Sequence, residues 1–143
     1  MKTLKTIMLG VSLFIICSLN VNAAQRGPRP SQTDVVNIFM NASTHGKIEG
    51  LEEVLANDME YQVKRGTKTT ITSKKQLLDL YKANQNIEQA CICTTNTIEN
   101  ADNVVVKIDM KYDTYTRTNV VTMVNTNTGW RITKVNTSVA NNA

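Results

Sequence analysis

The segment 104–116 constrains the fold of this chain more than any other feature of the sequence. Between Val104 and Met110 every second residue is apolar, and from Lys107 onward the intervening positions carry charges of alternating sign. Alternation with period two is typical of a strand whose sheet buries one face and leaves the other in water. The sequence therefore predicts an antiparallel sheet with one apolar face that another part of the chain must cover.

The covering elements come from segments with helical periodicity that lie earlier in the chain. Apolar residues recur at helical spacing after Ser31 and after Ile48, and Ser31 and Ser73 begin patterns typical of a capped helix N-terminus. Near Asn86 the period changes from 3.6 to 2. In chain order we expect helices at 31–46 and 48–58, short strands at 61–63 and 68–72, a helix at 73–81, and strands at 87–98, 104–116, 119–125 and 130–139, the last with a bulge between Ile132 and Val135.

The first 24 residues have the three-part layout of a secretory signal peptide. Lys2 and Lys5 precede an apolar stretch at 7–19, and small residues follow at 21–24, where we expect cleavage. The stretch is shorter than the roughly 20 residues that a membrane span needs. An uncleaved anchor is the alternative, and a lipoprotein at Cys17 is disfavoured because no small residue stands just before it. We therefore expect an exported protein, periplasmic or extracellular, with no membrane span after cleavage, a flexible lead-in at 25–30 and a single domain at 31–143.

The charge balance argues against nucleic acid as a partner. The chain has 16 basic and 12 acidic residues, and loss of Lys2 and Lys5 with the signal peptide leaves 14 basic residues, an excess of two. The basic runs are no longer than the pairs 64–65 and 74–75. Nucleic-acid binding needs a clustered basic face, so we expect no such partner.

Few residues could support metal or nucleophilic chemistry. Cys91 and Cys93 are the only cysteines left after export, and His45 is the only histidine. A Cys-x-Cys metal site needs further ligands, and cysteines two apart on a strand project in parallel. Free, half-buried thiols are therefore favoured over a strained disulfide or a zinc or copper site, and His45, in a turn, is interpreted as solvated. We expect no metal and no cofactor.

The order of these elements resembles the NTF2-like superfamily, which includes nuclear transport factor 2, SnoaL-like proteins and ketosteroid isomerase. The resemblance spans nearly all of the chain after the signal peptide. It rests on the two-helix start, on residues 57–61 leading into a strand, on the path from Gly66 to the capped helix ending at 80–81, and on residues 129–132 opening the last strand. It implies an α+β cone, with three helices packed on a strongly curved antiparallel sheet of about six strands. It also implies frequent homodimers through the sheet, and no single function.

A ligand-binding cone is the favoured function. Such a pocket is expected to have apolar walls with a few polar groups, here tyrosines. The expected lining comprises Phe39, Met40, Leu77, Tyr81, Val106, Ile108, Met110, Tyr112, Val124 and Trp130. We therefore expect an exported, non-catalytic protein that binds a small apolar or amphipathic ligand, or a protein partner, in its cone.

Two alternatives keep the same fold. An isomerase or lyase would need a general base and an oxyanion hole, for which Asp58 with one of three tyrosines, Tyr61, Tyr81 or Tyr112, is the weak candidate. A turn-capping role explains Asp58 more simply, so no catalytic residue is assigned. A structural interaction module would instead fill the cone with its own side chains. The charged face of 104–116 is interpreted as solvated, with the polar interface of a homodimer as the alternative.

Overall fold

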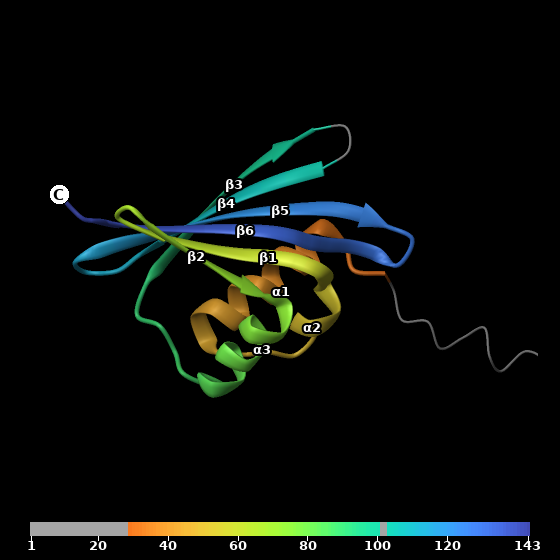
Figure 1. Ribbon diagram of the computed structural model, residues 1–143, viewed down its shortest axis with the longest axis horizontal. Helices are drawn as coiled ribbons and strands as arrows, with labels where there is room; N and C mark the ends of the chain where they lie inside the picture. The colour runs from red at the N-terminus through yellow and green to blue at the C-terminus, as the bar shows by residue number, and fades with distance from the viewer. Residues whose placement is uncertain (1–28, 101–102) are drawn as a thin grey trace, which may run out of the picture.

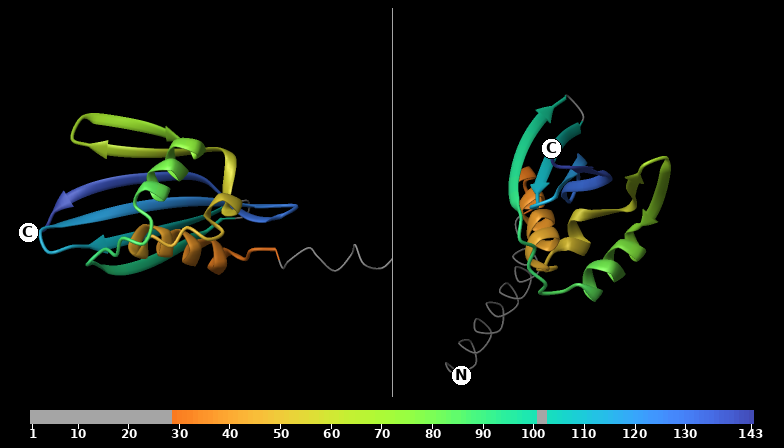
Figure 2. Two further views of the ribbon diagram at one scale, coloured as in Figure 1. Left: turned by 90° about the horizontal axis from the view of Figure 1, so that it is seen from below. Right: turned by 90° about the vertical axis from the view of Figure 1, so that its left-hand side faces the viewer.

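The structure, a computed structural model, describes residues 29–100 and 103–143. In chain order they form α1 (Gln32–His45), α2 (Leu51–Val54), β1 (Leu55–Arg65), β2 (Lys68–Ser73), α3 (Lys74–Ala83), β3 (Ile92–Glu99), β4 (Asn103–Lys111), β5 (Tyr115–Thr126) and β6 (Gly129–Asn141). Figures 1 and 2 show the three helices on one side of a sheet that bends around them. The α+β cone inferred from the sequence is confirmed.

The expected signal peptide and most of the lead-in lie outside the described residues. Pro30, at the end of that lead-in, contacts the sheet, since its carbonyl accepts a hydrogen bond of 3.1 Å from the amide of Trp130. Within the described ranges, no helix is long and apolar enough to cross a membrane.

The six strands form one sheet in the order β2-β1-β6-β5-β4-β3. All neighbours are antiparallel except β1 and β6, which run parallel, so the expectation of a wholly antiparallel sheet was wrong at this pair. The parallel pair arises because the meander β3–β6 returns to the first hairpin from the far side of the sheet. The predicted bulge is confirmed: Thr122 pairs with Lys134 and Met123 with Ile132, which leaves Thr133 as the extra residue.

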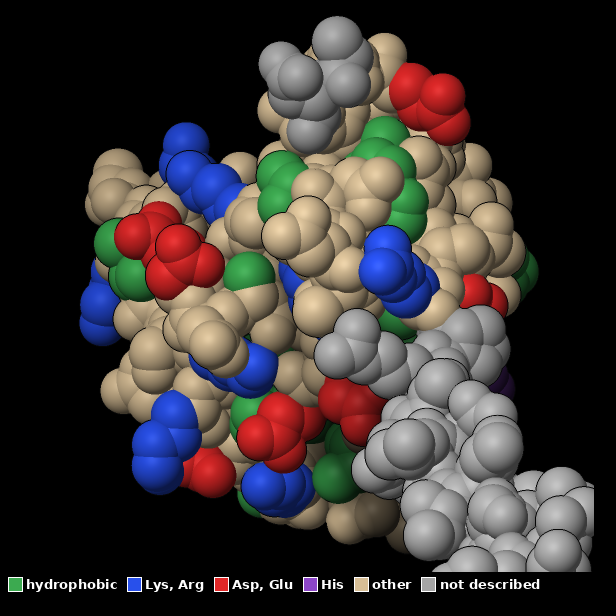
Figure 3. All heavy atoms as spheres, turned by 90° about the vertical axis from the view of Figure 1, so that its right-hand side faces the viewer, with side chains coloured by type: hydrophobic (Ala, Val, Ile, Leu, Met, Phe, Trp, Pro, Cys, Tyr) green, Lys and Arg blue, Asp and Glu red, His purple; other side chains and the backbone are tan. Residues whose placement is uncertain are grey.

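The core lies between the sheet and α1, as the alternating segment predicts. The side chains of Val104, Val106, Ile108 and Met110 are at most 2% exposed. They belong to one apolar cluster with Val35 and Phe39 of α1. On the opposite face of β4, Lys107 and Lys111 are exposed and Lys107 pairs with Asp109 at 3.0 Å. On the end of the molecule drawn in Figure 3, acidic and basic side chains are interspersed.

The second helix is shorter than the sequence predicts. The expected helix at 48–58 is reduced to one turn at Leu51–Val54, and the following residues already belong to β1. Leu55 and Met59 fit helical spacing, but in the structure both are buried from the strand, with Leu55 paired to Ile132 of β6. Tertiary pairing has overridden the local pattern. Asp58 therefore lies within β1 and not at the end of a helix.

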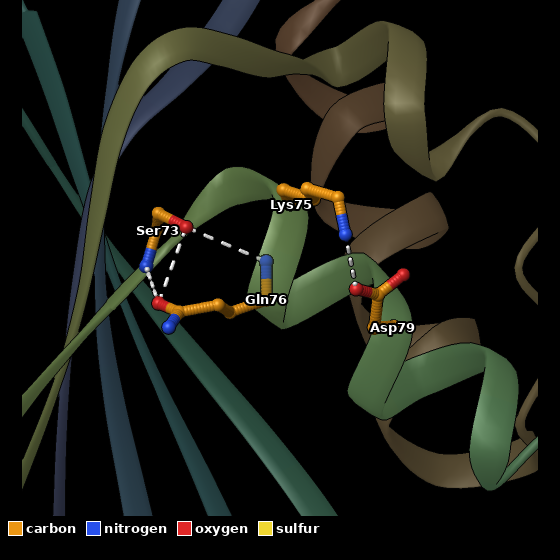
Figure 4. Close-up of polar contacts among 4 residues, drawn as sticks. All are labelled: Ser73, Lys75, Gln76 and Asp79. Atoms are coloured by element: carbon orange, nitrogen blue, oxygen red, sulfur yellow. Dashed lines mark hydrogen bonds and ion pairs between the residues drawn. The ribbon is translucent and has the colours of Figure 1, made fainter.

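Both predicted helix N-termini are confirmed as capping boxes. At α3, Ser73 Oγ accepts a hydrogen bond from the amide of Gln76, and Gln76 Oε1 accepts one of 3.0 Å from the amide of Ser73 (Figure 4). One turn further on, Lys75 and Asp79 form an exposed ion pair at 2.9 Å. The cap at Ser31 uses Asp34 in the same way. These caps fix where α1 and α3 begin.

Truncating the core residue Ile108 should destabilise the protein far more than removing its charged neighbour. We expect Ile108→Ala to lower the free energy of unfolding by about 2–5 kcal/mol, because it leaves a cavity in a packed core. Lys107→Ala removes only a surface ion pair and should cost less than about 1 kcal/mol. Urea denaturation of both variants tests this, and equal losses would mean that the face of β4 bearing Lys107 is buried in an interface.

Loss of the α3 cap should have a smaller, local effect. We expect Ser73→Ala to cost about 1 kcal/mol of stability, because the amide of Gln76 loses its side-chain acceptor, Ser73 Oγ. Lys75→Ala, two residues on, removes only the exposed pair with Asp79 and should cost about 0.5 kcal/mol or less. The thermal unfolding of the two variants can be compared directly, and a larger loss for Lys75→Ala would contradict the cap assignment.

Candidate ligand-binding site

A large cavity lies at the open end of the cone, between the β1–β2 hairpin, α3 and the ends of β5 and β6. In Figure 1 this is the left-hand end of the sheet, near the C-terminus. Its volume is about 580 Å³, within the range typical of small-molecule pockets. The walls are formed by Tyr61, Val63, Arg65, Gly66, Leu80, Tyr115, Arg117, Thr137, Val139 and Asn141.

A smaller cavity of about 230 Å³ continues the large one inward. The two share Tyr61, Leu80 and Arg117, so they meet at these side chains. The smaller part reaches Ser43 on α1 and Tyr81 on α3. We call the two together the cone cavity. Its outer part, which we call the mouth, carries the apolar side chains of Val63, Leu80 and Val139. Its inner part, which we call the waist, is polar and contains Tyr61, Arg117, Ser43 and Tyr81.

Arg117 is the centre of the polar waist. It projects from β5 and donates a hydrogen bond from Nη2 to the hydroxyl of Tyr61 on β1. The hydroxyl of Tyr81 lies 2.8 Å from Ser43 Oγ. The sequence contains four tyrosines, and the remaining two, Tyr112 and Tyr115, stack with ring centroids 4.5 Å apart. All four tyrosines thus lie around one arginine: Tyr61 on β1, Tyr81 on α3, Tyr112 in the β4–β5 turn and Tyr115 at the start of β5.

The loop between α3 and β3 is fixed against the end of α1, and this positions one further polar group. The amide of Asn86 donates to the carbonyl of Gly46 at 3.0 Å, and that of Gln89 donates to the carbonyl of Thr44 at 2.6 Å. Gly46 has φ 63°, and a Cβ there would lie 2.5 Å from the amide nitrogen of Asn86, so only glycine permits this approach. Gln89 in turn accepts a hydrogen bond of 3.2 Å from the Tyr112 hydroxyl.

Two of the tyrosines near Arg117 have raised pKa values. Burial, with the nearby Tyr61 as a second cause, raises the pKa of Tyr81 to about 12. Burial, followed by the neighbouring Cys91, raises the pKa of Tyr112 to about 12. Burial alone would lower the pKa of Arg117, but the surrounding tyrosines more than offset this, and its pKa is raised. At neutral pH the phenols of Tyr81 and Tyr112 are therefore neutral beside the guanidinium cation of Arg117.

Three of the ten residues expected to line the pocket instead belong to the packed core of the cone. Phe39, Ile108 and Met110 are fully buried in the core and do not border the cone cavity. Leu77 and Tyr81 border its inner part, whereas Met40 and Val106 line a separate cavity of about 330 Å³ between α1 and the β3–β4 edge. The structure thus brings only part of the expected lining together.

Three expected lining residues lie elsewhere. Val124 is on the opposite face of β5 from the buried Met123, because neighbouring residues of a strand point to opposite sides. Trp130 is the second residue of β6 and lies at the far end of the sheet, nine residues or about 30 Å along the strand from Val139. Tyr112 stacks on Tyr115, which lines the cone cavity, but Tyr112 itself does not line it.

The other candidate chemistry is not assembled at this site. Asp58 is exposed and does not line the cone cavity, so the structure does not place the suggested general base beside the tyrosines. His45 is exposed, as expected, with Nδ1 2.7 Å from Thr44 Oγ1. Cys91 and Cys93 are free and half-buried, with sulfurs 3.9 Å apart. Among the described residues, no group of three or more His, Cys, Asp and Glu side chains could hold a metal ion.

Arg117 was not identified from the sequence because the strand that carries it was predicted too short. The expected strand began at 119, whereas β5 begins at Tyr115. Extending the alternation of Met123, Val121 and Asn119 backward places Arg117 and Tyr115 on the inner face. The alternation therefore continues to Tyr115, but the inward positions beyond Asn119 are polar and do not extend the apolar pattern that indicates a buried strand face.

The fold and its cavity define the chain as an NTF2-like protein, an α+β cone open at one end. A comparison with protein families matches residues 31–136 to the family described as "Putative lumazine-binding", and the chain belongs to that family. A comparison with curated proteins gave no match.

Solved structures of low sequence identity share this fold. An NTF2-like protein from Cytophaga hutchinsonii aligns with a TM-score of 0.62 at 15% identity, over 76% of this chain and 94% of its own. An NTF-2 like protein of unknown function from Silicibacter pomeroyi gives 0.61 at 13% identity, over 77% and 92%. A "putative ketosteroid isomerase" from Parabacteroides distasonis gives 0.54 at 10% identity, over 75% and 86%. At such identities the likeness establishes the fold alone.

The raised tyrosine pKa values should appear in both spectroscopy and stability. Between pH 10, the ordinary value, and about 12, the unfolded chain binds fewer protons than the folded protein, so the free energy of unfolding falls as the pH rises through that window. The ultraviolet phenolate signal of the folded protein should still be incomplete at about pH 11. Tyr81→Phe should remove part of the late signal, and ionisation of all four tyrosines near pH 10 in folded protein would contradict the buried cluster.

Proposed function

We propose that this is an exported protein that binds a small amphipathic molecule in the cone cavity without chemical turnover. The observation that supports this most directly is the cavity itself. It is open, has a volume of about 580 Å³ and combines an apolar mouth with a few placed polar groups. Ligand pockets of soluble proteins are typically built in this way. The family description, which names lumazine binding, is consistent with a small-molecule ligand.

The lining supports binding better than catalysis. None of the residues that line the cone cavity is an aspartate, glutamate or histidine, so the described walls offer no general base with an ordinary or raised carboxyl pKa. The phenols of Tyr81 and Tyr112, with pKa values of about 12, are poor bases at neutral pH. An isomerase using Asp58 would require that exposed side chain to reach the cavity from outside.

Export and self-association complete the proposal. The signal-peptide pattern at 1–24 supports a periplasmic or extracellular location. A homodimer through the outer face of the sheet also stays a prediction. The ion pair between the exposed Lys107 and the half-buried Asp109 would make that interface polar.

Filling the mouth of the cavity should abolish binding of an apolar dye. Val139 lines the mouth and is 44% exposed, so Val139→Trp should fill it without overpacking the core. We expect binding of the neutral dye N-phenyl-1-naphthylamine, followed by its fluorescence, to weaken about tenfold or more, which corresponds to about 1.4 kcal/mol.

The matched control is the next residue of the same strand. Ala140 is exposed and points to the outer face of β6, so Ala140→Trp adds the same side chain outside the cavity and should leave dye binding unchanged. No saturable binding by the unmodified protein, or equal loss in both variants, would refute the proposed site.

A further inference from the structure

The cone cavity carries positive charge that its described walls do not neutralise. Arg117 lines both parts of the cavity and Arg65 stands at its rim, whereas no aspartate or glutamate lines either part. The ion pairs found among the described residues lie elsewhere, on α3 and on the outer face of β4. Buried or half-buried charges are ordinarily paired, so a half-buried guanidinium without a carboxylate marks a place for an anion.

The hydrogen-bonding capacity of Arg117 is also incompletely used. A guanidinium has five N–H donors, and the only side-chain acceptor it contacts in the described structure is the Tyr61 hydroxyl, through Nη2. Every fully buried side-chain nitrogen and oxygen of the described residues has a partner. The nitrogens of Arg117 that lack one are therefore open to the cavity, where a bound molecule can accept from them.

The neighbouring tyrosines cannot provide the missing charge. Tyr81 and Tyr112, whose pKa values are raised to about 12, remain neutral at neutral pH. They offer hydroxyl groups to a ligand but no counter-ion to Arg117. The negative charge has to come from solvent or from the ligand itself.

We propose that the ligand of the cone cavity is a small amphipathic carboxylate, held by the guanidinium of Arg117 and packed through its apolar body against Val63, Leu80 and Val139. This inference rests on the ligand-binding function proposed above. The planar fork of a guanidinium matches a carboxylate, which can accept two parallel hydrogen bonds from it. Leu80 and Val139 are 54% and 44% exposed, so the mouth offers apolar surface that the ligand body would cover. Arg65 at the rim adds attraction for an approaching anion.

The lining argues for a carboxylate over a phosphate. Phosphate sites characteristically use several backbone amides at the N-terminus of a helix. The N-termini of α1 and α3 are capped by Ser31 and Ser73, and neither serine lines the cone cavity. A single half-buried guanidinium balances one negative charge, which is the charge of a monocarboxylate.

Two probes that differ mainly in charge test this inference. The affinities of 2-naphthoate and of its neutral analogue 2-naphthamide are measured by calorimetry, with N-phenyl-1-naphthylamine reporting that the cavity is intact. We expect 2-naphthoate to bind at least about tenfold more tightly than 2-naphthamide, because hydrogen bonds to charged groups contribute more than neutral ones. In Arg117→Met this preference should vanish while the dye still binds.

The matched control removes one positive charge from the other side of the same sheet. Lys64 is exposed and neighbours Arg65 on β1, but points to the outer face, so Lys64→Met should retain the preference for 2-naphthoate. If Arg117→Met loses dye binding as well, Arg117→Lys decides. A reduced preference with the dye retained supports the proposal, and an unchanged preference overturns it.

The remaining outcomes separate this inference from the proposed function. If the dye binds but the two naphthalene probes bind equally, the carboxylate is wrong while the ligand-binding function stands. If inorganic phosphate displaces 2-naphthoate better than acetate does, the site is a phosphate site and the carboxylate is again overturned. If the unmodified protein binds neither the dye nor the probes, the proposed function itself fails.

Discussion

The structure depends on the inward-facing rows of side chains along the strands, which change from apolar to polar within single strands. On β5 the row runs from Met123 and Val121, both buried in the core, through Asn119 to Arg117 and Tyr115 at the cavity. On β6 it runs from Ile132 and Val135 to Thr137, Val139 and Asn141. The hydrophobic effect favours burial of the apolar half of each row against the helices. The polar half cannot be buried without hydrogen-bond partners, because desolvating an unpaired polar group is costly. The cone is consequently packed at one end and open at the other.

A layer of satisfied polar groups separates the two halves. Asn119 and Thr137 are almost completely buried, and Thr137 Oγ1 donates a hydrogen bond of 2.7 Å to Asn119 Oδ1. The side-chain nitrogen of Asn119, Nδ2, in turn donates to the sulfur of Met110 at 3.4 Å. Buried polar groups with their hydrogen bonds made are tolerated in a core, and each one fixes the register of its strand. This layer therefore sets the depth at which the core stops and the cavity begins.

The sequence predicted the packed half of the cone well and the open half poorly, for one physical reason. Apolar alternation and helix caps are local signals, so the inner face of β4 and the start of α3 at Ser73 could be recognised from the order of residues alone. Arg117 and Tyr61, in contrast, are 56 residues apart in the chain and meet only because β1 and β5 both flank β6. No local pattern encodes that meeting.

The same reasoning explains why the expected pocket was placed too deep. Apolar side chains such as Phe39 and Met110 were assigned to a ligand surface, but in a small domain the most apolar inward residues are needed for the protein's own core. What remains for a ligand is the part of the inner face that folding does not use. In this chain that part contains Arg117 and three of the four tyrosines.

Residues at the open end of such a cone can change without disturbing its core. The apolar side chains at the mouth of the cavity contribute little to the packed core, since Leu80 and Val139 are about half exposed. Substitutions there change the chemistry of the cavity at small cost in stability, whereas substitutions at Ile108 or Met123 disturb close packing. An NTF2-like cone can thus keep one core and alter the ligand it accepts by changing a few residues at the open ends of its strands. Under the proposed function, the charge at position 117 determines which ligand is accepted, whereas the apolar row behind it maintains the fold.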